Sequence, residues 1–584
     1  MGKLPVVKKM VMKKNILFIF FLCCSKLVFG QDANFLWVKQ FGGTGTSAAR
    51  SMKLDASGNI YTIGVFSGTV DFNPGSGIYN LTSIGDHDIF VSKLDSAGNF
   101  IWAKQIGGQL YYAEYDLALD AEGNIHITGT FWGLVDFDPG AGIFNLNTIG
   151  THDLFVLKLD SFGNFIWAKQ IGGPLGAVEG TSISLDDLGN IYTTGYFADT
   201  IDFDPGAGTF MLNTDHTWLF SMFVLKLNPS GNFVWAKAMY GPYSGVQSES
   251  ISIDRFGNVL TTGQFRDTVD FDPGVGSFTL VPFNSFGLWD AFISKLDSSG
   301  NFVWAKQFGG ESTQIGFSIT TDAFSNVYTT GVFDATTDFD PGLGTFFMTP
   351  TTERNTFISK LDAAGNFVWA KQISGYSHGN AITLDAENNV YTTGYFDGYT
   401  DFDPGSGTSI INEPLTSPDT FIAKYDGSGN FIWVRRFVGA APSSNYGASI
   451  GVDAFNNIYT TGWFQGTSDF DPSINTFNFT SSSETNAYIH KMCQGCSAGI
   501  SEGFLPNNMS LFPNPTNGQI NLTTNDQNEI INLKIINSTG QVILERSKLF
   551  SKQIILDISI EADGIYFLEV TMADGIYRSK FLKN

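Results

Sequence analysis

The sequence is poor in cysteine, histidine and long apolar runs, and each shortage narrows what the protein can be. Its 584 residues include four cysteines and six histidines. The apolar stretch Ile16–Leu22 is too short to span a bilayer. Neither an H-E-x-x-H motif nor a Walker A motif is present, so the sequence indicates no zincin and no P-loop nucleotide site.

Basic residues are also scarce, with 33 Lys and Arg against 56 Asp and Glu, which gives a formal net charge of −23. The first 30 residues carry six lysines and no acid, so a chain without them would change from −23 to −29. So acidic a protein is not expected to bind nucleic acid through its phosphates, although it attracts cations. Glycine and phenylalanine are abundant, at 65 and 54 residues, as suits a turn-rich all-β chain.

A repeated unit accounts for most of the chain. Its best-preserved stretch is Ala291–Gln307, AFISKLDSSGNFVWAKQ. The tryptophan of this stretch recurs every 64 to 69 residues, at Trp37, Trp102, Trp167, Trp235, Trp304, Trp369 and Trp433. A second motif, D-F-D-P-G, keeps step with it and begins at Asp71, Asp136, Asp202, Asp270, Asp338, Asp401 and Asp469.

Each unit is predicted to form four antiparallel strands. In the third copy the expected strands are Thr181–Leu185, Ile191–Phe197, Met222–Leu227 and Phe233–Ala238. The D/N-x-x-G-N segments after the first and third strands suit tight hairpins, because Gly adopts positive φ freely. A sheet that is apolar on both faces must pack against its neighbours, and radial repetition in a β-propeller satisfies this.

The two ends of the repeat array predict ring closure. The array begins with an unpaired fourth strand, Phe35–Gln40, and ends after a third strand, Tyr488–Met492. The N-terminal strand can therefore complete the last blade and leave no free edge. Residues 34 to 492 resemble the SBBP family of β-propeller repeats, which implies a seven-bladed propeller but no single activity.

The N-terminal segment 1–30 is predicted to be a secretory signal peptide, with five early lysines, the apolar core and cleavage before Gln31. Cys23 and Cys24 would suit a lipoprotein, but Leu22 and Cys23 precede them where a small residue is needed. If cleavage occurs before Gln31, the mature chain begins with the propeller, which we expect over 31–492. We expect no transmembrane segment in the mature chain.

A linker is expected over 493–508, because Cys493–Asn508 breaks the repeat pattern. Cys493 and Cys496 form a C-x-x-C pair that could be a redox motif, half a zinc site or a small disulfide loop. No second cysteine pair completes a zinc site, and no βαβ pattern surrounds the pair. A local disulfide is favoured in an exported protein.

The C-terminal segment 509–584 is predicted to be a small β-sandwich of about seven short strands. It resembles the type A C-terminal sorting domain of the type IX secretion system, which implies export across the outer membrane followed by removal of the domain. The mature protein would then be released or attached to surface lipopolysaccharide. The residues that carry this resemblance are Pro513, Asn514, Pro515, Gly518, Gly540, Gly564, Tyr566 and Lys580.

The D-F-D-P-G loops should all lie on one face of the disc, since each joins the second and third strands of a unit. Asp residues at i and i+2 could bind Ca²⁺, but a Gly stands where calcium loops place a third oxygen ligand. The structural alternative is that the first Asp caps a turn, with Pro and Gly central in a type II turn. The candidate calcium ligands are Asp136, Asp138, Asp202, Asp204, Asp270, Asp272, Asp338, Asp340, Asp401, Asp403, Asp469 and Asp471. No other cofactor is indicated.

The crossovers between units vary more than the rest of the repeat, as loops that contact ligands often do. Aromatic rings beside carboxylates could stack on a sugar and bond its hydroxyls. The candidate ligand residues in these crossovers are Tyr111, Tyr112, Tyr115, Tyr240, Tyr243 and Tyr376. His87 and His152 are expected to make local hydrogen bonds, and the repeated third-strand lysines to make ion pairs or to snorkel.

We therefore expect a secreted or surface-attached binding or scaffold module, handled by the type IX secretion machinery, whose ligand is a surface glycan or a protein. The alternative is an extracellular enzyme on polysaccharide, with its site on the acidic face. Such an enzyme needs two carboxylates at a suitable separation, and nothing in the sequence singles out a pair. A purely structural surface component is the third option.

Overall fold

The computed structural model describes residues 33–110, 115–214, 219–283, 287–412, 417–481, 484–494 and most of 509–583. All regular elements in these residues are β-strands, and no helix is present among them. The described part therefore contains no helix that is long and apolar enough to cross a membrane.

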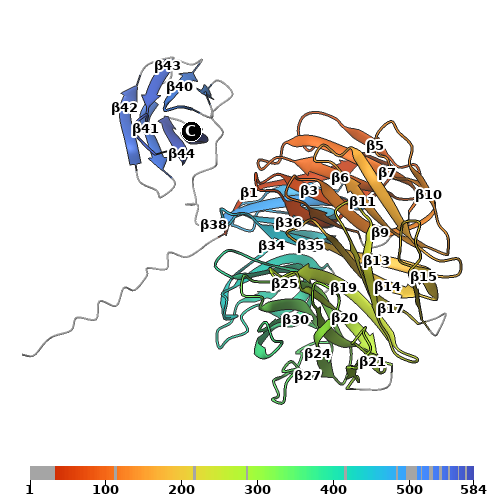
Figure 1. Cartoon of the computed structure of the whole chain (residues 1–584). Helices are drawn as coiled ribbons and strands as arrows, with labels where there is room; N and C mark the ends of the chain where they lie inside the picture. The colour runs from red at the N-terminus through yellow and green to blue at the C-terminus, as the bar shows by residue number, and fades with distance from the viewer. Residues whose placement is uncertain are drawn as a thin grey trace, which may run out of the picture.

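The strand pairings of the described residues between 33 and 494 repeat as seven antiparallel sets of four, one for each unit. Figure 1 shows these sheets beside one another. The first strands are β2 (Thr46–Leu54), β8 (Asp116–Leu119), β13 (Ala177–Leu185), β19 (Gly245–Ile253), β25 (Gln314–Thr321), the second part of β30 (Phe367–Leu384) and β35 (Val438–Val452). The second strands are β3 (Ile60–Ser67), β9 (Ile125–Asp136), β14 (Ile191–Ala198), β20 (Val259–Arg266), β26 (Val327–Phe333), β31 (Val390–Asp401) and β36 (Ile458–Asp469).

The outer strands continue the same order. The third strands are β6 (Asp88–Leu94), β11 (Asp153–Leu159), β17 (Ser221–Leu227), β23 (Asp290–Leu296), β29 (Asn355–Leu361), β33 (Asp419–Tyr425) and β38 (Asn486–Gln494). The fourth strands are β7 (Phe100–Leu110), β12 (Phe165–Ile171), β18 (Phe233–Met239), β24 (Phe302–Gly310), the first part of β30, β34 (Phe431–Arg436) and β1 (Ala33–Gly43). The four strands predicted for the third copy are all present.

The D/N-x-x-G-N segments form the predicted hairpins. In the first, Asp55 Oδ1 accepts hydrogen bonds from the backbone N–H of Ser57 and of Asn59, each at 2.9 Å. Gly58 has a φ of 76°, so the turn uses the left-handed region. Three of these turns have a residue other than Gly at the same place, namely Ser325, Asn388 and Asn456, with φ of 61°, 62° and 61°.

The N-terminal strand β1 pairs with β38, as the ends of the array predict (Figure 1). Val38 lies opposite His490 and Gln40 opposite Tyr488 in an antiparallel register. The last unit therefore consists of β35, β36, β38 and β1, and it is completed by residues more than 400 positions earlier in the chain.

The first strands of adjacent units contact one another in a series that returns to its start, since β2 contacts both β8 and β35. A serine side chain commonly links two of them. Ser182 Oγ accepts from Ile251 N at 3.4 Å, and Ser250 Oγ accepts from Ile319 N at 3.4 Å. Between the last and first units, Ser449 Oγ accepts from Met52 N at 3.3 Å.

The repeated third-strand lysines join neighbouring units, in keeping with the structural role predicted for them. Lys226 Nζ lies 4.8 Å from the ring centre of Tyr192 and donates to the carbonyl of Ser298 in the next unit at 3.1 Å. Lys491 of the last unit donates in the same way to Ser96 of the first unit, at 2.9 Å. Ion pairs with the turn aspartates accompany these contacts, such as Lys295 with Asp254 at 3.0 Å.

The C-terminal residues form two further sheets that share one hydrophobic core. One sheet has the order β39 (Met509–Phe512), β40 (Gln519–Thr524) and β43 (Gln553–Asp557). The other has the order β42 (Val542–Leu549), β41 (Ile530–Asn537), β44 (Gly564–Met572) and β45 (Gly575–Lys583).

Candidate functional site

The D-F-D-P-G loops are closed by their own aspartates. In the second unit, Asp136 Oδ1 accepts from the backbone N–H of Asp138 at 3.1 Å and of Phe144 at 2.8 Å. Asp138 Oδ1 accepts from Gly140 N at 2.8 Å. The same three bonds recur in all seven loops, with Asn73 replacing the second Asp in the first unit and Ser473 replacing the Gly in the last.

The predicted type II turn is wrong, although the capping role of the first Asp is confirmed. A type II turn requires a positive φ at its third residue. The glycine of D-F-D-P-G in the six loops that have one lies outside the range from +20° to +160°. The second glycine of these loops is needed for a different reason. A Cβ on Gly142 would collide with Oδ2 of Asp138, because the carboxylate folds back over the loop.

Each loop is also a short hairpin that the sequence did not predict. The two arms pair as β15 (Thr200–Asp202) with β16 (Met211–Asn213) in the third unit. The other arms are β4 (Thr69–Asp71) with β5 (Asn80–Thr82), β10 (Asn145–Asn147) on β9, β21 (Val269–Asp270) with β22 (Thr279–Leu280), β27 (Thr337–Asp338) with β28 (Phe347–Met348), β32 (Ile410–Asn412) on β31, and β37 (Asn478–Thr480) on β36.

Each loop from the second unit to the seventh thus contains two of the candidate calcium ligands. Among the described residues, no group of three or more His, Cys, Asp or Glu side chains is placed to hold a metal ion. Calcium at these loops stays a prediction.

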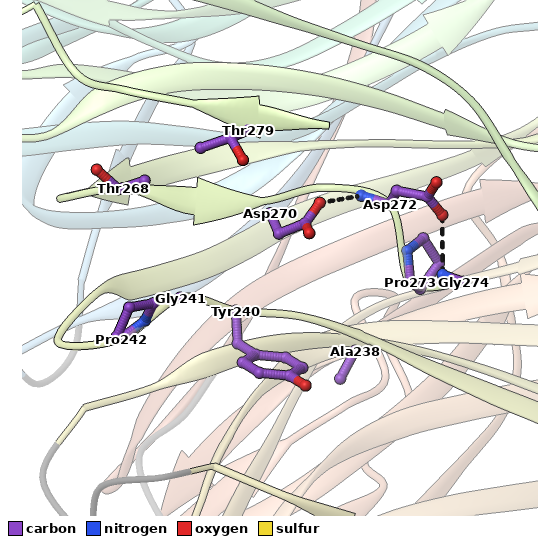
Figure 2. A pocket seen from close by; sticks show the side chains of 10 residues that line it. All are labelled: Ala238, Tyr240, Gly241, Pro242, Thr268, Asp270, Asp272, Pro273, Gly274 and Thr279. Atoms are coloured by element: carbon purple, nitrogen blue, oxygen red, sulfur yellow. Dashed lines mark hydrogen bonds between the residues drawn. The ribbon is translucent and has the colours of Figure 1, made fainter. Parts of the chain in front are cut away.

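A pocket of about 350 Å³ brings together three of the residues singled out from the sequence: Tyr240, Asp270 and Asp272 (Figure 2). The other lining residues include Pro242 and Thr268. The Tyr240 side chain is 47% exposed, so its ring is open to a ligand. The pocket lies between the crossover that leaves the third unit and the D-F-D-P-G loop of the fourth. Its volume is at the small end of ligand pockets.

The pocket differs from its counterparts because of Tyr240. In every unit, the backbone of the first loop Asp pairs with one residue from the preceding fourth strand or crossover. In the fourth unit this residue is Tyr240, which pairs with Asp270. The other units have a smaller residue at this place, which is Gly42, Gly107, Gly172, Gly309, Ser374 or Val438. A tyrosine opposite the first loop Asp therefore occurs once in this set.

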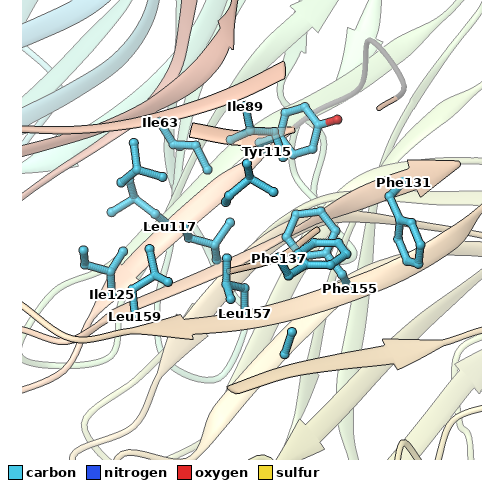
Figure 3. Packing of buried hydrophobic residues seen from close by; sticks show 14 of the residues in the cluster. Ile63, Ile89, Tyr115, Leu117, Ile125, Phe131, Phe137, Phe155, Leu157 and Leu159 are labelled. Carbon is cyan, nitrogen blue, oxygen red and sulfur yellow. The ribbon is translucent and has the colours of Figure 1, made fainter. Parts of the chain in front are cut away.

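The other predicted tyrosines are dispersed. Tyr111 and Tyr112 lie outside the described residues. Tyr115 is only 2% exposed and belongs to the core between the first and second units, beside Phe155 (Figure 3), so it offers no ring to a surface ligand. Tyr243 is 70% exposed, and Tyr376 is half-buried on β30.

A set of cross-strand pairs, which sequence reasoning missed, carries the largest differences between units. Each pair joins a residue near the start of a first strand to one near the end of the adjacent second strand. The pairs are Ala48 with Val65, Glu179 with Tyr196, Gln247 with Gln264, Ile315 with Val332, His378 with Tyr395, and Tyr446 with Trp463. Aligning the seven copies by their second strands, which read T-T-G-x-F in five units, would have revealed this variable column.

Two buried aspartates have strongly perturbed pKa values. Burial raises the pKa of Asp419 to about 7 and that of Asp290 to about 6. The Asp419 side chain is 1% exposed, and its Oδ1 accepts from Gly439 N at 2.9 Å and Asn445 Nδ2 at 3.2 Å. A carboxyl so enclosed does not reach a substrate, and both residues begin third strands, where they serve the fold.

Two G-x-S-x-G sequences, at 375–379 and 447–451, are also structural. Ser377 and Ser449 lie within β30 and β35, whereas a nucleophile elbow places its serine on a strand-to-helix turn. Ser377 is fully buried and accepts from Thr356 N at 3.0 Å.

The remaining sequence candidates are placed as follows. His152 Nε2 lies 3.2 Å from Glu179 Oε1, and Cys493 is disulfide-bonded. Its predicted partner Cys496 lies outside the described residues, as do Asn514, Pro515 and Gly540. Of the sorting residues, Gly518 has a φ of 116°, and the Tyr566 hydroxyl donates to the carbonyl of Ala562 at 2.5 Å. Pro513 follows β39, Gly564 begins β44, and Lys580 lies on β45.

Comparison with known families identifies two parts of the chain. Residues 510–584 match the secretion system C-terminal sorting domain, and residues 166–196 and 303–332 match the beta-propeller repeat family SBBP. The chain thus carries SBBP β-propeller repeats and a C-terminal sorting domain, which indicates type IX secretion to the extracellular space or the cell surface.

Individual relatives are distant. An uncharacterized WD repeat-containing protein of Acanthamoeba polyphaga mimivirus is 24% identical over 480 residues, which cover 69% of this chain and 34% of that protein. The regulatory protein FlaEY of Caulobacter vibrioides is 27% identical over 149 residues, 26% of this chain and 15% of that one. The matches thus span about a third or less of these relatives. The crystal structure of Sqt1 from Chaetomium thermophilum matches 84% of this chain and 97% of its own, at 10% identity and a TM-score of 0.30.

Proposed function

We propose that this exported SBBP-repeat protein is a closed seven-bladed propeller that binds a glycan at or outside the cell surface. In this proposal residues 1–30 are the signal peptide, 31–492 the propeller, 493–508 a linker and 509–584 a β-sandwich that is removed after export. The return of the first-strand contacts from β35 to β2, and the bond from Lys491 to Ser96, support the closed ring.

The observation that carries the binding function is the pocket at Tyr240. The aspartates recur in all units, and their role in forming the loops accounts for them. Tyr240 is half-exposed at a position where four other units have glycine, and the loop structure does not account for it. A tyrosine ring offers a stacking face, and Asp270 and Asp272 each keep a second carboxylate oxygen beyond the loop bonds. A sugar unit presents C–H faces and hydroxyls that match these groups.

The experiment is co-sedimentation of the full chain with particles of cellulose, chitin, xylan and curdlan. The matched variant is Tyr240→Gly, which restores the residue found in other units and leaves both aspartates in place. We expect binding to at least one polysaccharide and a loss of about tenfold in affinity for Tyr240→Gly, since about 1.4 kcal/mol corresponds to tenfold. Equal sedimentation of both proteins, or of neither, would contradict the proposal.

The enzyme alternative is tested in the same samples by measuring reducing ends released from the polysaccharides. Release by the wild-type chain that is lost on substitution of a loop aspartate would replace the binding function with a hydrolytic one.

A further inference from the structure

A row of aromatic rings crosses three neighbouring units, and neither the repeat pattern nor the pocket at Tyr240 accounts for it. The aromatic row consists of Phe317, His378, Tyr395, Tyr446 and Trp463. Ring centres are 4.5 Å apart between Phe317 and His378, 4.9 Å between His378 and Tyr395, 4.8 Å between Tyr395 and Tyr446, and 4.0 Å between Tyr446 and Trp463. All five side chains are half-buried, so part of each remains accessible.

The fold does not require these rings. At the corresponding pairs, the first unit has Ala48 and Val65, which are 4% and 2% exposed, and the fifth unit has Ile315 with the fully buried Val332. Small aliphatic residues thus close the same space. The aromatic side chains are larger and leave ring surface in contact with solvent, where it contributes less to folding.

Polar groups border the aromatic row. Tyr376 is paired in register with Asp397 on β31, and Asp397 Oδ1 is buried without a hydrogen-bond partner in the described structure. Burial, followed by the nearby phenols of Tyr376 and Tyr446, raises the pKa of Tyr395 to about 12. Arg354 is also close to Tyr376 and Tyr395, and it is held by Asp334 at 2.9 Å.

Across the ring of first strands, the third and fourth units present polar pairs. The Tyr196 hydroxyl donates to Glu179 Oε2 at 2.8 Å, and Gln264 Nε2 donates to Gln247 Oε1 at 2.8 Å. In the order of the units, the third and fourth directly precede the fifth, sixth and seventh, which carry the aromatic row. The equivalent pairs are therefore amide- or carboxylate-containing in the third and fourth units and aromatic in the sixth and seventh.

We propose that the aromatic row, with Tyr376, Arg354 and Asp397 beside it, binds a neutral polysaccharide chain. Pyranose rings offer C–H faces to aromatic side chains and hydroxyls to phenols, carboxylates and guanidinium groups. The net charge of −23 disfavours an acidic polymer, which selects a neutral one. The inference concerns a second surface and does not depend on the pocket at Tyr240.

The test is calorimetric titration of the full chain with neutral hexasaccharides of β-1,4-glucose, β-1,3-glucose, β-1,4-xylose and α-1,4-glucose. The main variant is Tyr446→Ile with Trp463→Val, which copies the Ile315 and Val332 pair of the fifth unit. The matched control, Gln247→Ile with Gln264→Val, makes the same change in the fourth unit. We expect the main variant to weaken binding by about tenfold or more and the control by less than about threefold, because stacking rather than polar contact dominates affinity.

A second variant tests the same surface in case the main variant does not fold. Tyr376→Phe removes one hydroxyl and keeps the ring, and we expect it to weaken binding by about threefold or more through the lost hydrogen bond. Absence of binding to all four hexasaccharides would overturn the inference, and so would an affinity that neither variant changes. Binding that is lost in Tyr240→Gly but kept in both of these variants would assign the sugar to the pocket alone.

Discussion

Asp419 begins a third strand at a position where the units use Asp, Ser or Asn. The equivalents are Asp88, Asp153, Ser221, Asp290, Asn355 and Asn486. The Asp419 carboxyl is enclosed, and burial together with the nearby charge of Asp397 raises its pKa to about 7. The folded protein therefore holds this proton more tightly than the unfolded chain does, where the pKa is near its ordinary value. The resulting stability is present at low pH and is lost as the pH rises through about 7.

Asp419→Asn is expected to raise the free energy of unfolding at pH 8 by up to about 4 kcal/mol, because it removes a buried charge that costs roughly 1.4 kcal/mol for each of about three pKa units. An amide oxygen can still accept from Gly439 N and Asn445 Nδ2. The wild-type stability should fall between pH 4 and pH 8 relative to that of the variant, as measured by urea denaturation across this range.

The control is Asp88→Asn at the equivalent position of the first unit. Asp88 accepts from Ile84 N, Gly85 N and Gln105 Nε2, so its charge is well compensated by donors. We expect no gain from this change. A gain at Asp88 equal to that at Asp419, or a loss of stability in Asp419→Asn at pH 8, would contradict the argument.

At the scale of the element, the D-F-D-P-G loop is a hairpin in which the two Asp side chains make different hydrogen bonds. The first Asp holds both arms of the loop by accepting from two backbone N–H groups, which lie two and eight residues after it. The second Asp caps only the Pro-Gly corner, and Asn73 makes the same bond to Gly75 N at 2.9 Å in the first unit. The charge of the second acid is therefore dispensable for the loop, whereas the first oxygen is not.

We expect Asp136→Ala to lower the free energy of unfolding by about 2 kcal/mol, because two backbone N–H groups lose their acceptor. Asp138→Asn should change it by less than about 0.5 kcal/mol, as is usual for a change that keeps the local contacts. Thermal melts with Ca²⁺ and with a chelator complete the measurement. A melting temperature that rises with Ca²⁺ in the wild type but not in Asp138→Asn would show that the loop binds calcium and that the charge is needed.

At the scale of the whole molecule, β1 ties the beginning of the described chain to its last repeat. Val38 is 3% exposed and packs in the core between the sixth and seventh units with Tyr391, Trp433 and Met492. The partners of one short strand thus come from residues far apart in the sequence. Such long-range pairing makes the units depend on one another, since a blade left open would expose a sheet edge.

Val38→Asp is expected to destabilise the protein by about 3 kcal/mol or more, because it buries an uncompensated charge. Lys53→Asp, on the exposed side of β2, is the control and should change the stability by less than about 0.5 kcal/mol. Urea denaturation measures both. If Val38→Asp is as stable as Lys53→Asp, β1 does not complete the seventh unit and the ring is open.

The repeat period, the strands and the closing pair could be predicted because they depend on local patterns. Alternating β-branched and aromatic residues define the strands, and D/N-x-x-G-N defines hairpins wherever Asp can accept from the backbone two and four residues on. The incomplete units at both ends predicted the pairing of β1 with β38. The motifs of the C-terminal segment likewise predicted the sorting domain from its residues alone.

The candidate sites depended on three-dimensional packing. The sequence could not say that Tyr115 points into a core while Tyr240 stays half-exposed, because both follow a fourth strand in a variable crossover. It suggested a positive φ for the glycine of D-F-D-P-G, which the structure does not show, and it did not reveal that the second loop glycine leaves room for the carboxylate of the second Asp. Successive residues of the aromatic row are 17 to 61 positions apart in the sequence and lie in separate strands. Only the stacking of one unit against the next brings those rings together, since side-chain proximity between sheets is set by packing and not by local pattern.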